Sequence, residues 1–277
     1  MPRLFRFTLL LALIWCQQVM GQAAEIDKKH ADAVYIAIII DDLGHNLQRG
    51  KAFIDLPAPL TFAILPHTTH AHQIAAAAHQ ARKEIMVHLP MANVANTPIG
   101  PGGLTANQPK VEFLVALDAA IKSVPFAQGI NNHTGSYLTQ QPQQMNWLMS
   151  DMKQRDLFFV DSRTTPNSVA KIVADEHQVF ASSRDVFLDN DRNPEAIDAA
   201  FQYLIKKARQ DGSAIAIGHP YPETLKYLKK AIPKLAAEGI QVLTTSSLIA
   251  LQHMRHLEQR ELELHAHPAP SVAAASD

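Results

Sequence analysis

The chain contains a single cysteine, Cys16, among its 277 residues. This cysteine lies within the first two dozen residues, and removal of that segment would leave none, which excludes disulfide bonds and thiol catalysis. The chain also lacks an excess of charge of either sign, because 25 Lys and Arg residues oppose 26 Asp and Glu residues. A protein that binds nucleic acid or an anionic membrane surface needs a basic face. The composition therefore argues against both partners.

Motifs of several common enzyme classes are also missing from the sequence. It has no Gly-x-Gly-x-x-Gly and no Gly-Lys-Ser/Thr, so no loop that cradles phosphate groups is visible. It has no Gly-x-Ser-x-Gly turn of the kind that carries the nucleophile of serine hydrolases. Histidine, in contrast, occurs 14 times, and several of these histidines follow predicted strands.

The first 23 residues have the composition of a secretory signal peptide. Arg3 and Arg6 give a basic start, residues 9–15 form an apolar run, and the small-x-small sequence at residues 21–23 is a cleavage signal. The apolar run is too short to span a bilayer. We predict cleavage after Ala23 and a periplasmic protein with no membrane span; an uncleaved N-terminal anchor is the alternative.

Apolar runs of strand type alternate with amphipathic helical patterns from residue 33 onward. The first run, residues 33–40, reads AVYIAIII, as expected for a strand buried on both faces of a parallel sheet. Similar runs occupy residues 60–65, 84–89, 127–131, 157–160, 179–181, 214–217 and 239–243. Thr165-Pro166 is typical of a helix start.

This alternation predicts an α/β fold with seven or eight parallel strands over residues 33–252. The segment after it, residues 253–277, is charged at first and then rich in Ala and Pro. We expect this C-terminal tail to be disordered beyond a final helix.

Polar or titratable side chains follow most of the predicted strands. The first strand runs into Asp41 and Asp42, and the third ends at His88. Later strands are followed by His133, by Asp161 and Arg163, by Asp185 and by His219. Each has an ordinary structural explanation by itself, such as a helix cap. The carboxyl ends of parallel strands meet at one rim, however, so together they predict a shared site.

The mixture of carboxylates and imidazoles suits zinc or another divalent first-row metal. A catalytic zinc takes three protein ligands and keeps an open position for water. Of two adjacent carboxylates, one can bind the metal while the other stays free as a base. A histidine on the opposite wall could then protonate a leaving group. These residue types therefore indicate metal-assisted hydrolysis.

Six short motifs, in this order along the chain, resemble those of the divergent polysaccharide deacetylases, a branch of the NodB-like carbohydrate esterases. They are IDDLG (40–44), TFAILP (61–66), HLPM (88–91), NNHTGS (131–136), FVDSRT (159–164) and GHP (218–220). The resemblance covers residues 33–250 and implies a distorted seven-stranded (β/α) barrel with a divalent metal, usually zinc.

The resemblance also implies roles for individual residues. Asp41 matches the catalytic base of the family, Asp42 its metal ligand, and His219 its catalytic acid. His88 stands where the family has its first metal-binding histidine. The second should follow four residues later, where this chain has Ala92.

His133, on the neighbouring strand, could supply the ligand that is missing at Ala92. Asp161, Arg163 and Asp185 are candidates for supporting the ligands or orienting the substrate.

The resemblance implies a hydrolase that removes acetyl groups from a cell-envelope glycan, either peptidoglycan or another polysaccharide. The departure at Ala92 leaves a second hypothesis open. In that hypothesis the chain is a catalytically inactive deacetylase-like barrel that binds a glycan or an envelope protein.

Overall fold

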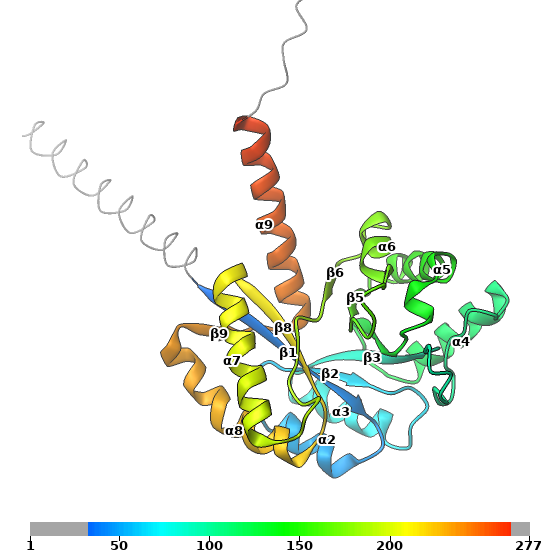
Figure 1. The fold of residues 1–277 in the computed structure, drawn as a ribbon. Coiled ribbons are helices and arrows are strands. Elements are labelled where there is room, and N and C mark those ends of the chain that lie inside the picture. Colours follow the sequence, from blue (N-terminus) through cyan, green and yellow to red (C-terminus); the bar gives the residue numbers. More distant parts are fainter. Residues whose placement is uncertain (1–32, 267–277) are drawn as a thin grey trace, which may run out of the picture.

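Nine parallel strands and the helices between them make up the described part of this computed structural model, residues 33–266 (Figure 1). The strands are β1 (Val34–Leu43), β2 (Thr61–Ile64), β3 (Glu84–Met91), β4 (Gly129–Thr134), β5 (Phe158–Asp161), β6 (Ala181–Ser183), β7 (Val186–Phe187), β8 (Ser213–Gly218) and β9 (Ile240–Val242). The helices are α2 (Leu47–Ile54), α3 (Ala71–Gln80), α4 (Lys110–Lys122), α5 (Pro142–Gln154), α6 (Ala170–Glu176), α7 (Pro194–Asp211), α8 (Pro222–Leu235) and α9 (Thr245–Ala266). The predicted signal peptide, residues 1–23, and the end of the predicted tail, residues 267–277, lie outside the described residues.

The strands form one sheet in the order β6-β5-β4-β3-β2-β1-β8-β7, and β9 pairs with the first half of β1. The extended segment of residues 181–187, which contains β6 and β7, contacts strands near both edges of the sheet. The backbone N–H of Arg184 donates to the carbonyl of Asp161 in β5, and that of Asp185 donates to the carbonyl of Ile215 in β8, both at 2.9 Å. The sheet therefore curls into a half-barrel whose edges are joined by one segment. This architecture confirms the expected distorted (β/α) barrel.

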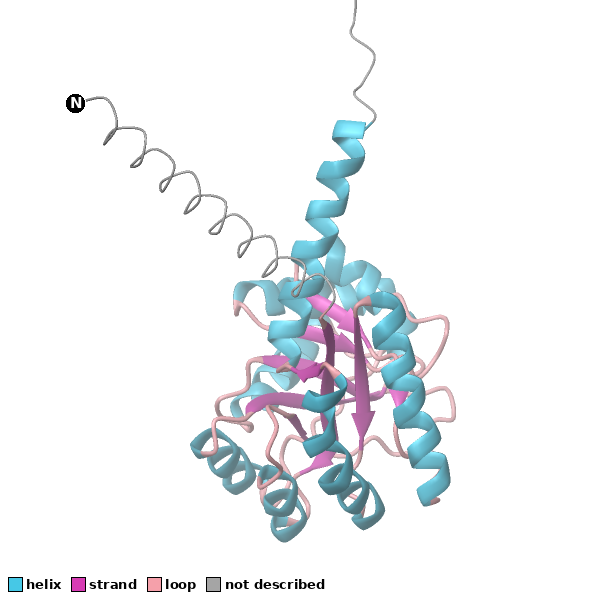
Figure 2. Cartoon of the chain, turned by 90° about the vertical axis from the view of Figure 1, so that its left-hand side faces the viewer, coloured by secondary structure: helices cyan, strands magenta, loops and turns pink. Residues whose placement is uncertain are grey.

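Both faces of the sheet are buried, which explains why its strands read as uninterrupted apolar runs. On β1, Ile36, Ile38 and Ile40 pack into the outer layer of the core, which the helices cover (Figure 2). Ala37 and Ile39 alternate with them and face the barrel interior.

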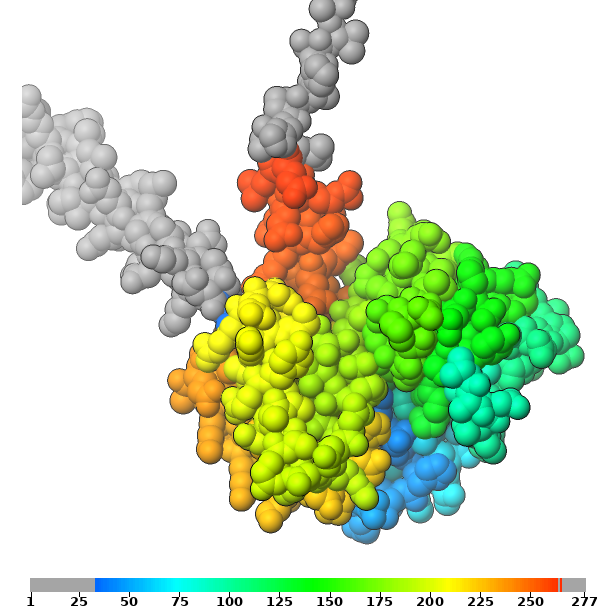
Figure 3. Space-filling model, viewed as in Figure 1, coloured from blue at the N-terminus to red at the C-terminus, as the bar shows by residue number. Residues whose placement is uncertain are grey.

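Helix α9 begins at the amino-terminal end of the barrel. Its Leu248 and Ile249 are buried among the interior side chains of the sheet. At the first residue of β3, the buried carboxylate of Glu84 accepts hydrogen bonds from the Thr61 hydroxyl (2.8 Å) and from the backbone N–H of Ser246. The rest of α9 extends away from the body of the molecule (Figures 1 and 3). No helix within the described residues is long and apolar enough to cross a membrane.

One helix boundary differs from the sequence expectations. Helix α6 begins at Ala170 instead of at Thr165-Pro166. The N–H of Val169 bonds to the carbonyl of Thr139, which holds the preceding residues in turns. Helix α9 continues to Ala266 and is the final helix that we expected before the end of the chain. Most residues between positions 254 and 264 are strong helix formers, which explains its length.

Candidate active site

Five of the side chains selected from the sequence meet at the carboxyl end of the sheet. Asp41 and Asp42 lie near the end of β1, His88 lies in β3, His133 lies in β4, and His219 directly follows β8. Contacts between their side chains bring these residues to one rim, as the sequence predicts.

Asp41 and Asp42 both reach the site although they are adjacent on one strand. In a regular strand, successive side chains point to opposite faces of the sheet. The register of β1 against β2 shifts between Ile40 and Leu43, and Asp42 has a φ of 54°. This bulge and the left-handed backbone at Asp42 turn the second carboxylate toward the same side as the first.

Three potential metal-ligand atoms converge from Asp42, His88 and His133. Oδ1 of Asp42 lies 3.2 Å from Nε2 of His88 and 3.0 Å from Nδ1 of His133. The two histidine nitrogens lie 3.0 Å from each other. Pairing of β3 with β4 places Pro90 opposite His133, so this histidine comes beside His88 from the neighbouring strand.

Asn131 connects Asp41 to His88. It lies opposite His88 in the register of β3 and β4. Its Nδ2 donates to Oδ1 of Asp41 (2.8 Å), and its Oδ1 lies 2.8 Å from Nδ1 of His88. Asn131 lies within one of the six family motifs, and the sequence by itself indicated no role for it.

His219 is held by Asp189, which sequence analysis missed. Oδ1 of Asp189 lies 2.7 Å from Nδ1 of His219. Oδ2 of Asp189 accepts from the backbone N–H of His219 (2.7 Å) and from the hydroxyl of Thr224 (2.6 Å). Nε2 of His219 lies 4.0 Å from Oδ2 of Asp42. The only sequence signal for Asp189 is its place after a strand of two residues, β7, which is too short to recognise.

Residues 38–249 match the model of a family described as divergent polysaccharide deacetylase. The chain is also 35% identical over 214 residues to the protein YibQ of Escherichia coli, a match that covers 77% of this chain and 67% of YibQ. The chain belongs to the divergent polysaccharide deacetylase family. The resemblance inferred from the six motifs is thereby confirmed.

Solved structures share the fold of this chain. The protein ATU2773 of Agrobacterium tumefaciens superimposes with a TM-score of 0.75 at 22% identity, over 78% of this chain and 89% of that one. A D285S mutant of the peptidoglycan deacetylase PdaC of Bacillus subtilis gives a TM-score of 0.53 at 12% identity, over 84% and 98% of the two chains. At these identities the likeness establishes the fold.

The donor set of the candidate site fits a divalent metal ion. Oδ1 of Asp42 is buried and has no hydrogen-bond partner among the described residues; the histidine nitrogens at 3.0–3.2 Å face it instead. Tetrahedral zinc with bonds of about 2.0–2.1 Å separates its ligand atoms by about 3.3 Å. The observed spacing is close to that value, and the mixed oxygen and nitrogen donors suit zinc.

Asp42, His88 and His133 form the metal-ligand cluster, and the pKa values in and beside it are shifted because several charges are buried together. Burial alone would raise the pKa of Asp42, but His133 and His88 outweigh it and hold this pKa well below its usual range. Burial would lower the pKa of His88, but the charges of Asp41 and Asp42 raise it to about 9. The pKa of Asp41 is raised by burial, against the opposing effect of His88 and His219. Asp41 is thus the carboxylate of the pair with the greater affinity for a proton.

Asp161 and Arg163 lie at the end of β5 and in the loop after it. Asp161 is fully buried; its Oδ1 accepts from the backbone N–H of Arg163 (2.8 Å), and its Oδ2 has no partner among the described residues. The exposed guanidinium of Arg163 donates to the carbonyl of Pro166 (3.4 Å). Neither side chain makes a hydrogen bond or ion pair to the metal-ligand cluster among the described residues.

Asp185 contacts the edge of the sheet instead of the cluster. Its carboxylate accepts from the backbone N–H of Ile215 (2.8 Å) and lies 3.5 Å from Nζ of Lys207. Its neighbour Arg184 faces the His219 side of the site. The Arg184 guanidinium lies 3.7 Å from the ring centroid of Phe187, which stacks on His219 at 6.1 Å. Asp185 therefore lies at the sheet edge, and Arg184 lies nearer to the site.

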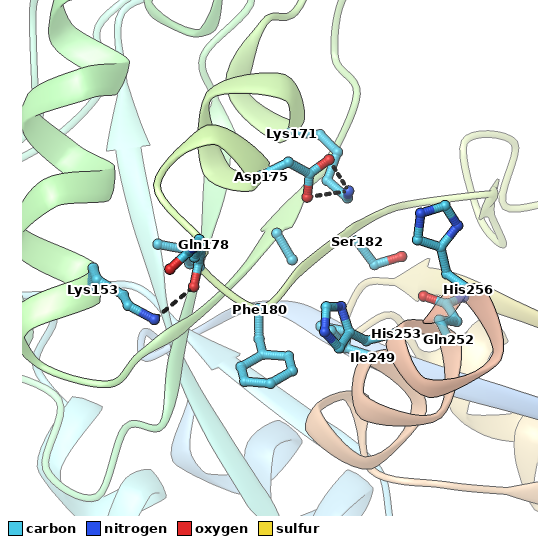
Figure 4. Close-up of a pocket in the computed structure, with 12 residues that line it drawn as sticks. Lys153, Lys171, Asp175, Gln178, Phe180, Ser182, Ile249, Gln252, His253 and His256 are labelled. Carbon is cyan, nitrogen blue, oxygen red and sulfur yellow. Dashed lines mark hydrogen bonds and ion pairs between the residues drawn. The ribbon is translucent and has the colours of Figure 1, made fainter. Parts of the chain in front are cut away.

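A groove of about 650 Å³ lies away from these residues, between α9, β6 and the end of α6 (Figure 4). Phe180 and His253 stand on its walls, with ring centroids 5.2 Å apart. Its lysines already have partners, because Lys153 donates to the carbonyl of Gln178 (2.9 Å) and Lys171 pairs with Asp175. The groove contains no residue of the metal-ligand cluster.

Proposed function

We propose that this divergent polysaccharide deacetylase is a metal-dependent hydrolase that removes acetyl groups from a cell-envelope glycan. The observation that carries the proposal is the convergence of Asp42, His88 and His133, with Asp41 on one side and His219 on another. A bound zinc ion would polarise the acetyl carbonyl and lower the pKa of a water molecule.

Asp41 is positioned to act as the general base. Its Oδ1 is occupied by the hydrogen bond from Asn131, and its Oδ2 lies 3.6 Å from Nε2 of His88, on the side of the cluster. Oδ2 is therefore the atom that takes a proton from the attacking water. The water oxygen forms a bond to the acetyl carbon as this proton leaves.

His219 is positioned to act as the general acid. Its Nδ1 is held by Asp189, so the proton that it can give is on Nε2, which faces the cluster. Burial would lower the pKa of His219, but the hydrogen bond and charge of Asp189 raise it and favour the protonated ring. The carbon–nitrogen bond of the acetamido group breaks, and His219 protonates the departing amine while acetate is released.

We propose peptidoglycan or another N-acetylated envelope polysaccharide as the substrate. The fold is shared with a peptidoglycan deacetylase of Bacillus subtilis, which supports this class of substrate. A cleaved signal peptide at residues 1–23 would place the enzyme in the periplasm, where such a glycan is found.

The second candidate function is binding of a glycan or an envelope protein without hydrolysis. The alanine at position 92, where the family resemblance implies a metal-binding histidine, favours it. Nδ1 of His133 occupies the third ligand position, 3.0 Å from Oδ1 of Asp42, and therefore supports the hydrolase.

The test is zinc content and acetate release measured on the full mature chain. Wild type and the control His72→Ala, which changes an exposed histidine, should carry about one zinc per chain, whereas Asp42→Ala and His133→Ala should lose it. Asp41→Asn should keep zinc and stop acetate release from peptidoglycan fragments. A wild type that stays free of zinc when zinc is offered would reject the hydrolase and favour the binding protein.

A further inference from the structure

The side chain of Asn131 is fully buried and contacts two functional groups of the site at once. One end of its amide meets the proposed base Asp41, and the other meets the proposed metal ligand His88, each at 2.8 Å. Burying an amide is costly unless its hydrogen bonds are made. The two bonds satisfy both ends of this amide.

The carboxylate of Asp41 determines which way the Asn131 amide points. An ionised carboxylate only accepts hydrogen bonds, so the NH₂ group of Asn131 must face it. The amide oxygen then faces Nδ1 of His88, and it can only accept. Nδ1 of His88 must therefore carry a proton, which fixes the tautomer of the ring.

This tautomer leaves Nε2 of neutral His88 with its lone pair free. Nε2 is the atom that lies 3.2 Å from Oδ1 of Asp42 and 3.0 Å from Nδ1 of His133. The nitrogen that Asn131 leaves free is thus the one in the metal-ligand cluster. A partner on the second ring nitrogen also fixes the orientation of a ligating histidine.

The same amide also orients the base. Because Asn131 holds Oδ1 of Asp41, only Oδ2 is left to take a proton on the side of His88. We propose that Asn131 is a positioning residue that sets the ligating nitrogen of His88 and the reactive oxygen of Asp41 together. The part that concerns Asp41 rests on the proposed function, whereas the part that concerns His88 does not.

Asn132, the next residue on β4, provides a matched control. It is as deeply buried as Asn131, but among the described residues its amide bonds only to backbone groups: it accepts from the N–H of Ser162 (2.8 Å) and donates to the carbonyl of Thr134 (2.7 Å). Loss of the Asn132 amide removes two hydrogen bonds, and loss of the Asn131 amide removes three, of which one is a long contact to the Ser162 hydroxyl (3.4 Å). Effects specific to Asn131 should therefore separate a positioning role from a structural one.

The experiment compares Asn131→Leu, Asn131→Asp and Asn132→Leu in the full mature chain. Zinc affinity should fall about 10- to 100-fold in Asn131→Leu and stay within a few-fold of wild type in Asn132→Leu. Asn131→Asp keeps an acceptor for His88 but places a second carboxyl group beside Asp41, and two carboxylates this close share one proton. Because that proton leaves Asp41 a poor base, the variant should keep zinc affinity within a few-fold and lose acetate release. Thermal unfolding of each variant confirms that it is folded.

The hydrogen bond of His88 is also measured directly by NMR. Wild type should show a protected Nδ1–H proton of His88, with or without zinc; this proton should disappear in Asn131→Leu and persist in Asn132→Leu. Equal losses of zinc affinity in the two Leu variants, or a protected proton that remains in Asn131→Leu, would overturn the proposal. If wild type takes up no zinc, the proposed function fails, and the Nδ1–H proton alone decides the role of Asn131.

Discussion

Replacement of Asp189 by Asn should weaken His219 as a general acid without changing metal binding by Asp42, His88 and His133. The side chain of Asp189 is inaccessible to solvent and accepts three hydrogen bonds, two from His219 and one from the Thr224 hydroxyl. An Asn amide can accept on only one side. If its oxygen keeps the backbone N–H of His219 and the Thr224 hydroxyl, its NH₂ group faces Nδ1 of His219.

That arrangement forces Nδ1 of His219 to act as an acceptor and opposes protonation of the ring. The neutral ring then carries its proton on Nε2 and is a poor acid. General acid catalysis contributes about 10²- to 10⁴-fold, so acetate release should fall by that factor in Asp189→Asn. Zinc content should stay unchanged because Asp189 contacts no ligand of the cluster.

The stability of Asp189→Asn should depend on pH in a defined direction. One hydrogen bond between charged groups is lost, which corresponds to about 1.5–3 kcal/mol in the free energy of unfolding. The pKa of His219 is raised in the folded protein by Asp189. The stabilisation from this pair is therefore complete below the unfolded pKa of about 6.5 and is lost as the pH rises through the folded pKa.

Denaturant unfolding of the metal-free proteins between pH 5 and 9 measures this difference. The gap between wild type and Asp189→Asn should be largest at acid pH and shrink as the pH rises. Asp191→Asn, which removes a charge from an exposed residue of the same loop, is the control and should show no such trend. A gap that stays constant across this range would refute the assignment of His219 and Asp189 as a charged pair.

Three further predictions concern the metal site and the core. Because the pKa of metal-free His88 is about 9, zinc must displace a proton from His88 below that pH. The affinity of the protein for zinc, measured by chelator competition, should therefore rise about tenfold per pH unit between pH 6 and 8, and an affinity that does not change with pH would contradict ligation by His88. Glu84→Ala removes the acceptor of the Thr61 hydroxyl proton and of the Ser246 N–H, and should lower the free energy of unfolding by about 2–4 kcal/mol. Glu112→Ala changes an exposed residue of α4 and should change this free energy by less than about 0.5 kcal/mol. Ile249→Ala opens a cavity where α9 meets the barrel interior and should cost about 2–5 kcal/mol by denaturant unfolding; a cost as small as that of the exposed Leu262→Ala would show that α9 does not pack there.

The fold could be predicted because the sequence patterns that specify most of its strands and helices are local. A strand covered on both faces must be apolar, and residues 34–40 of β1 and 214–217 of β8 satisfy this requirement without reference to the rest of the sequence. The helix start at Asn193-Pro194 is local as well, because the Asn193 side chain caps the N–H of Glu195 (2.9 Å). The start of α6 is not determined by local sequence, because it depends on a hydrogen bond from the N–H of Val169 to the carbonyl of Thr139.

The individual roles within the site depend on which face of a strand each residue occupies. Asn131 and Asn132 are identical in type and adjacent, yet one holds the proposed base and the other holds backbone groups. In the same way, Arg184 faces the site, whereas its neighbour Asp185 contacts the edge of the sheet. Position along a strand cannot distinguish such neighbours, because a shift of one residue exchanges the two faces.

The sequence by itself determined the parallel α/β architecture, the family, and the rim at which Asp41, Asp42, His88, His133 and His219 gather. Only the tertiary structure decided that both aspartates face one cluster, because a bulge and a left-handed residue in β1 override strand alternation. It also decided that His133 lies beside His88, and that Asp189 and Asn131 hold the proposed acid and base. These contacts join residues far apart in the chain, so they are set by strand register and sheet curvature, which no local pattern encodes.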